Sequence, residues 1–175
     1  WEGSFPCWRG VAMNMFDSGA DGLYLFNPAL GEPRVWREIG EVATMAGKDR
    51  LYGIDRFEGP DSFTETPEVP LPAAASFQVG EDVGSVGAQN IDFSLHLWNW
   101  VLGDAFTIKL NGGFVEGLEP ADLSRNPEKG QWLQGQLDPK LVNRGENHLE
   151  VAVEGRGASA ALPVVLDAAQ LYVRF

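Results

Sequence analysis

The sequence is poor in the residues that build metal sites and covalent cross-links. It has one cysteine, Cys7, and two histidines, His96 and His148. A single cysteine excludes an internal disulfide, and no histidine near Cys7 in the chain would activate it as a nucleophile. Three such residues are also too few for a closed zinc site. We interpret both histidines as ordinary cross-strand residues.

Basic residues and long apolar runs are also scarce. Lys and Arg number 13 against 25 Asp and Glu, which gives a net charge of −12, and the basic residues are scattered along the chain. Phosphate backbones and acidic membrane surfaces would repel such a protein, so we expect neither nucleic acid nor a membrane as a partner. No apolar run reaches the roughly 18 residues that a membrane-spanning helix needs.

The first third of the chain combines helical periodicity with one short apolar run. Apolar residues between positions 11 and 16 recur at helical spacing, and Gly19 suits the end of that helix. The continuous apolar run Leu23–Phe26 predicts a buried strand. Pro33 suits the start of a second helical stretch, which Gly40 divides into two short helices.

Composition divides the chain into three parts. The segment 58–72 holds prolines at positions 60, 67, 70 and 72 together with four acidic residues. Because each proline removes a backbone donor, this segment predicts an extended linker. The sequence therefore predicts a helix–strand–helix segment over 1–57, a Pro-rich acidic linker over 58–72 and a β-sandwich domain over 73–175.

The last part of the chain alternates apolar and polar side chains with a period of two. The alternation runs through residues 91–98, 106–110, 149–153 and 171–175. It is typical of strands with one buried and one exposed face, and Gly, Asn and Pro fill the connections as in sandwiches and jelly rolls. The predicted fold class is mainly β, an antiparallel β-sandwich preceded by a short α/β segment.

Two segments rich in Asn and Gly carry a resemblance to a known family. Leu110-Asn111-Gly112 ends one predicted strand, and Gly145-Glu146-Asn147 opens another. Asn-Gly permits the positive φ of a tight hairpin, and Gly145 turns the chain before a core strand. Together with Leu137-Asp138-Pro139 and the strand 169–175, these segments resemble the galactose-binding-like β-sandwich, a jelly-roll module common as an accessory domain of glycoside hydrolases.

The stretch Trp8–Pro28 resembles the last helix–strand segment of a (β/α)8-barrel glycosidase domain. In such a domain Asn27 would end the final strand and face the mouth of the active site. This resemblance implies that most of the barrel and its catalytic carboxylates lie upstream, so no catalytic residue is carried over to this chain. We therefore expect a C-terminal fragment of a longer glycoside hydrolase.

Aromatic side chains of the β region are candidates for stacking on sugar rings, because a flat apolar ring packs well on the C–H face of a pyranose. Trp98 and Tyr172 fall on the polar faces of their predicted strands. The alternative is that these rings contact the linker or the N-terminal segment. With Asn27 added from the barrel resemblance, the candidate ligand-binding residues are Trp98, Trp100, Trp132, Tyr172 and Asn27.

The sequence predicts a non-catalytic accessory region that binds a glycan or supports the barrel. A purely structural or adhesion sandwich and a small complete enzyme acting on carbohydrate remain as alternatives. No cofactor is assigned, although sandwiches of this type can hold one structural calcium ion. We expect the segment 1–57 either to pack on the sandwich or to pair with another copy of the chain. The family resemblance favours a secreted or periplasmic location.

Overall fold

The computed structural model describes residues 5–24, 33–54, 69–122 and 130–175. Its elements in chain order are α1 Phe5–Asp17, α2 Pro33–Glu38, η1 Val42–Met45, β1 Arg50–Ile54, β2 Val69–Pro70, β3 Ala73–Val79, β4 Asn90–Trp98, β5 Ala105–Leu110, β6 Gly113–Phe114, β7 Glu119–Pro120, β8 Gln131–Gln136, η3 Pro139–Leu141, β9 Gly145–Gly155 and β10 Val165–Arg174. No helix in these ranges is long and apolar enough to cross a membrane.

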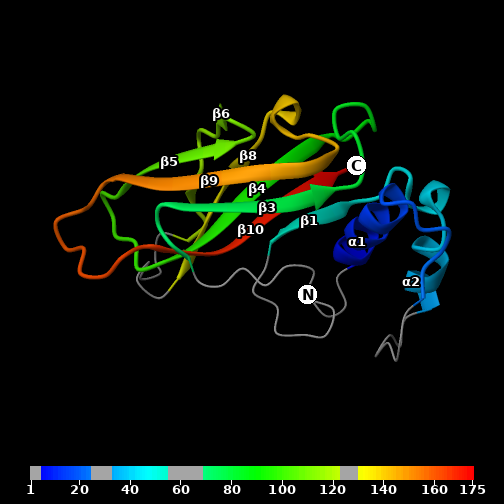
Figure 1. Cartoon of the computed structure of the whole chain (residues 1–175), viewed down its shortest axis with the longest axis horizontal. Coiled ribbons are helices and arrows are strands. Elements are labelled where there is room, and N and C mark those ends of the chain that lie inside the picture. The colour runs from blue at the N-terminus through cyan, green and yellow to red at the C-terminus, as the bar shows by residue number, and fades with distance from the viewer. Residues whose placement is uncertain (1–4, 25–32, 55–68, 123–129) are drawn as a thin grey trace.

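The strands form two antiparallel sheets packed as a sandwich (Figure 1). The six-stranded sheet has the order β1-β10-β4-β8-β7, and β2 also pairs with β10. The four-stranded sheet has the order β3-β9-β5-β6. The predicted fold class, a mainly β protein built as an antiparallel sandwich, is confirmed.

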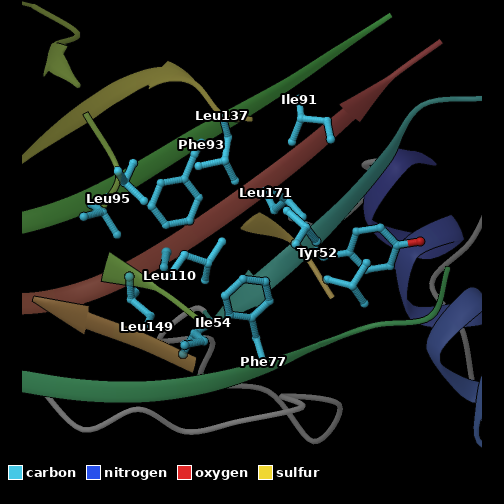
Figure 2. Close-up of a cluster of buried hydrophobic side chains, with 14 of the residues drawn as sticks. Tyr52, Ile54, Phe77, Ile91, Phe93, Leu95, Leu110, Leu137, Leu149 and Leu171 are labelled. Atoms are coloured by element: carbon cyan, nitrogen blue, oxygen red, sulfur yellow. The ribbon is translucent and has the colours of Figure 1, made fainter. Parts of the chain in front are cut away.

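The period-two pattern of the sequence builds the core between the sheets. In β4 the residues Phe93, Leu95 and Leu97 are fully buried, while the residues between them are half-buried on the other face. Figure 2 shows Phe93 and Leu95 in the same interior as Leu110 and Leu149 of the other sheet. Each such side chain contributes about 1.5–3 kcal/mol through burial, so the alternation settles which face of each strand lies inside.

The two Asn-Gly segments singled out in the sequence meet in the structure. Asn111 (φ 53°) and Gly112 (φ 81°) form the two-residue turn between β5 and β6. The Nδ2 of Asn111 donates to Oδ1 of the fully buried Asn147 at 2.8 Å. That oxygen also accepts the N–H of Asn143, and Asn147 Nδ2 donates to the carbonyls of Asn143 and Gly145. Every hydrogen-bonding position of the buried amide is therefore filled.

We expect Asn147→Ala to destabilise the protein by about 2–4 kcal/mol, because it removes a fully buried amide that accepts the N–H of Asn143 and the side chain of Asn111. Urea denaturation followed by circular dichroism measures the loss. Asn90→Ala, at an exposed strand end, is the control and should change the stability by less than about 0.5 kcal/mol. Equal midpoints for the two variants would contradict the expectation.

Helix α1 ends at Asp17, and Gly19 caps it as the sequence predicts. The N–H of Gly19 (φ 94°) donates to the carbonyl of Phe16 and the N–H of Ala20 to that of Met15, at 3.0 and 3.1 Å. This nested pair of bonds is the Schellman arrangement that a left-handed glycine permits. The second helical stretch is also confirmed: α2 begins at Pro33, and η1 follows as a separate short helix.

The strand predicted over Leu23–Phe26 is wrong where the structure describes it. Leu23 and Tyr24 lie outside any strand, and Tyr24 is 86% exposed; residues 25 and 26 lie outside the described ranges. The strand of this segment is instead β1, which pairs with β10. Its Gly53 is required, because a Cβ there would lie 2.1 Å from the carbonyl oxygen of Ala169.

The N-terminal segment packs onto the sandwich of its own chain, the first of the two alternatives that the sequence left open. Figure 1 shows α1 and α2 together at one end of the sandwich, and α1 packs against β1 and β3. Strand β1 comes from the range assigned to the N-terminal segment and β2 from the range assigned to the linker, yet both pair with β10. The three-part division of the chain stays a prediction.

A buried ion pair joins the two helices. Oε2 of Glu38 accepts Nε and Nη2 of Arg9 at 2.9 and 2.6 Å, and Arg9 Nη1 donates to the carbonyl of Asp49. Burial acts to raise the pKa of the Glu38 carboxyl, but hydrogen bonds from Arg34 and Arg9 outweigh burial and lower this pKa to about 2.

The lowered pKa predicts acid sensitivity. A folded-state pKa of about 2, below the ordinary 4.5, means that ionised Glu38 stabilises the fold fully above pH 4.5 and less as the pH falls toward 2. We expect Glu38→Gln to be less stable than wild type at pH 7 and the difference to shrink between pH 4.5 and 2. Thermal melts across this range measure it, with Glu119→Gln on β7 as control. A difference that stays constant down to pH 2 would refute the expectation.

Candidate functional site

Three half-buried aromatic rings gather on the outer face of the six-stranded sheet. His96 and Trp98 lie on the β4 face opposite the core, and Trp132 of β8 is directly opposite His96 in the register. The His96 ring centroid lies 5.0 Å from that of Trp132 and 5.5 Å from that of Trp98. We call His96, Trp98 and Trp132 the aromatic cluster.

A β-bulge in β10 adds a carboxylate to this cluster. Leu166 pairs with Leu97 and Ala168 with His96, so Asp167 is an extra residue in β10. Bulges re-aim side chains, and here Asp167 Oδ2 lies 2.6 Å from His96 Nδ1, with both side chains about 15% exposed. The hydrogen bond fixes the orientation of the imidazole ring between the two tryptophans.

The backbone at Gly130 passes directly over the aromatic cluster. A Cβ at this position would lie 2.9 Å from Cε1 of His96 and 3.0 Å from Cδ2 of Trp98, and the residue has φ 81°. Only glycine tolerates both the approach and the dihedral. Gly130 therefore covers part of His96 and Trp98 and keeps them half-buried.

Uncharged polar side chains lie next to the aromatic cluster on the same outer face. Ser94 of β4 pairs with Gln134 of β8 on one side and with Gln170 of β10 on the other. Gln134 is exposed, and the other two are half-buried. Amide and hydroxyl groups donate and accept hydrogen bonds, so this surface can pair a flat apolar contact with bonds to hydroxyl groups of a ligand.

Trp100, one of the predicted stacking residues, is placed in the core and cannot present its ring to a sugar. It is 4% exposed, and its ring packs edge-on against Phe106 with centroids 6.3 Å apart. The reason is local: β4 ends at Trp98, and Asn99 adopts φ 62°, which turns the following residue inward. A positive φ outside glycine is uncommon and is tolerated best by Asn. The period-two pattern of β4 therefore does not continue past Trp98 and wrongly predicts that Trp100 faces outward.

Tyr172 lies on the outer face, further along β10. Its hydroxyl is 3.3 Å from Asp49 Oδ2, and the Arg174 guanidinium lies 4.3 Å from its ring centroid. Burial and the charge of Asp49 raise the pKa of Tyr172. The ring therefore already has partners on the same chain. Asn27 lies outside the described residues.

Sequence reasoning missed His96, Asp167 and Gly130 as parts of the candidate site. One signal was present: the buried Leu166 and Leu171 are an odd number of residues apart, which an unbroken strand cannot place on one face. One extra residue in a β-bulge between them places both side chains on the same face. The described ranges contain no group of three or more His, Cys, Asp or Glu side chains arranged to hold a metal ion.

The solved structures similar to this chain include the following two. One is a β-porphyranase of glycoside hydrolase family 86 from the human gut bacterium Bacteroides plebeius, with 15% identity, a TM-score of 0.44, and 71% of this chain and 20% of that chain covered. The other is a family 35 carbohydrate-binding module from an environmental isolate, with 13% identity, a TM-score of 0.37, and 69% and 84% covered. The chain thus spans about a fifth of the porphyranase.

No family model matches the sequence. No curated protein matches it either. At these identities and TM-scores, the similarity carries no argument about ligand or activity.

We expect Gly130→Ala to displace His96 and Trp98, because the new Cβ would overlap both rings. The His96 ring proton resonances should shift, and the protein should lose about 1–3 kcal/mol of stability. Gly87→Ala is the matched control, with φ 76° and no atom within 4 Å of its Cβ, so it carries the backbone strain without the contact. Unchanged His96 resonances in Gly130→Ala would count against the described cluster.

Proposed function

We propose that this chain is a non-catalytic, glycan-binding accessory region and that its ligand binds at the part of the aromatic cluster that Gly130 leaves open. The observation that carries the proposal is the row of half-buried rings, Trp132, His96 and Trp98, on the outer face of a sheet. The accessory role within a larger glycoside hydrolase rests on the sequence resemblance alone.

The cluster suits sugar binding because its parts are rigid before a ligand arrives. The Asp167 hydrogen bond holds His96, and ring contacts at 5.0 Å hold Trp132 against it. A preordered aromatic surface loses little side-chain entropy on binding. Ser94, Gln134 and Gln170 then supply hydrogen bonds whose direction selects among sugars.

The competing enzyme hypothesis needs two carboxyl groups roughly 5–9 Å apart that flank a glycosidic bond. At the aromatic cluster the carboxylate in contact is Asp167, and it is hydrogen-bonded to His96. A carboxylate used to position an imidazole favours a binding surface over a hydrolytic pair. Release of chromophore from aryl glycosides by the purified chain would reverse this choice.

Trp132→Ala tests the binding surface. We expect it to weaken glycan binding roughly 10- to 30-fold, because it removes the ring that faces His96 and stays half-buried without a ligand. Affinity gel electrophoresis against a panel of neutral and acidic polysaccharides measures retardation.

Phe114→Ala is the control for this test, since Phe114 is a 63% exposed aromatic residue on β6 of the other sheet. It should leave retardation unchanged. If no polysaccharide in the panel retards wild type, or if both variants bind as wild type does, the proposed surface is wrong and the purely structural sandwich is favoured.

A further inference from the structure

A basic pocket lies beside α2 and η1, at the helical end of the molecule. It has a volume of about 470 Å³ and is lined by Arg34, Arg37, Glu38, Thr44 and Lys48. Three of these side chains are cations and one is an anion. We call this feature the basic pocket; it is separate from the aromatic cluster, which lies on β4 and β8.

Glu38 holds two of the three cations of the basic pocket, Arg34 and Lys48, in place. Its side chain is 8% exposed, and its Oε1 lies 2.7 Å from Arg34 Nε and 3.4 Å from Lys48 Nζ. Its other oxygen is taken by Arg9, which supports the carboxylate from the α1 side. A single buried carboxylate thus orders Arg34 and Lys48 at the pocket, and such preorganisation favours an anion site.

The pocket has more positive charge than its own carboxylate neutralises. Three of the 13 basic residues in a chain of net charge −12, Arg34, Arg37 and Lys48, line the pocket, and Glu38, the one carboxylate in its lining, is also paired with Arg9. Arg37 is exposed and forms no hydrogen bond or ion pair with any described residue. Cations held close together repel one another, and an anion between them relieves that repulsion.

We infer that the basic pocket binds an oxyanion and, resting on the proposed glycan-binding function, that this oxyanion is an acidic substituent of the glycan, a sulfate ester or a carboxylate. Guanidinium groups match the oxygens of such groups with paired donors, and the Lys48 ammonium adds a mobile point charge. Arg37 and Lys48 are the residues that would contact the anion, while Arg34 is oriented by Glu38.

A polysaccharide fits this pocket better than a nucleic acid does. Nucleic acids are bound along continuous basic stripes, whereas the basic residues outside this pocket are scattered through an acidic chain. One localised pocket binds one charged group at a time, and a sugar polymer with widely spaced acidic substituents presents its charges in that way. The screening length of about 8 Å at physiological salt also limits repulsion from distant carboxylates.

Two experiments on the full chain test this inference. The first titrates inorganic sulfate and monitors binding by NMR of the backbone amides and arginine side chains. The second compares retardation by dextran sulfate and by unsulfated dextran in affinity gel electrophoresis. Wild type should show saturable shifts at residues 33–48 and stronger retardation by dextran sulfate. Arg37→Gln and Lys48→Gln should each weaken both effects roughly ten-fold, because each removes one charged donor.

Lys140→Gln is the matched control, since it makes the same change in net charge at an exposed position in η3. It should leave sulfate and dextran sulfate binding within about two-fold of wild type. Melting temperatures establish that the variants fold. Because Arg37 is exposed, Arg37→Gln is the variant least expected to disturb the fold. Equal binding by Arg37→Gln, Lys48→Gln and Lys140→Gln would overturn the inference.

The outcomes separate this inference from the proposed function. Saturable sulfate binding without retardation by any polysaccharide would support the oxyanion site and contradict the glycan role. Retardation by neutral polysaccharides alone, lost in Trp132→Ala but with no sulfate saturation, would support the glycan role and contradict the oxyanion site. Dextran sulfate retained no better than dextran would contradict the acidic substituent.

Discussion

The hydrogen bond between Asn111 and Asn147 is the constraint on which the sandwich depends. It joins the β5–β6 turn to the start of β9, and the buried amide of Asn147 has no position left for water. Strand β9 pairs with β3 on one side and β5 on the other. A slip of one residue would turn Leu149 and Val151 out of the core, so a polar contact at the strand start sets the register for the apolar ones.

Strand β10 plays the matching role in the other sheet and links the core to the candidate site. It pairs with β1, β2 and β4, and so joins segments far apart in the chain. The bulge at Asp167 allows Leu166 and Leu171 both to face inward. The same bulge brings the carboxylate of Asp167 to His96 on the outer face. The packing of the interior and the geometry of the aromatic cluster therefore have one cause.

How far the sequence predicts this structure depends on the distance over which each signal acts. Alternation through 91–98 predicts β4, and Gly19 predicts the end of α1, because both signals are local. Strand β1 escapes prediction because the need for Gly53 arises from Ala169, more than a hundred residues away. Trp100 misleads because one backbone angle at Asn99 reverses its direction.

A chain of contacts leads from Tyr172, on the outer face of β10, to the basic pocket. Tyr172 reaches Asp49, whose carbonyl accepts Arg9, and Arg9 holds Glu38 at the pocket. Ala168, opposite His96, is four residues from Tyr172 along β10, or about 13 Å at strand rise. If the proposed glycan site and the proposed oxyanion site bind the same polymer, their two weak contacts reinforce each other. The pair could then select a long, acidic chain over a short or neutral one.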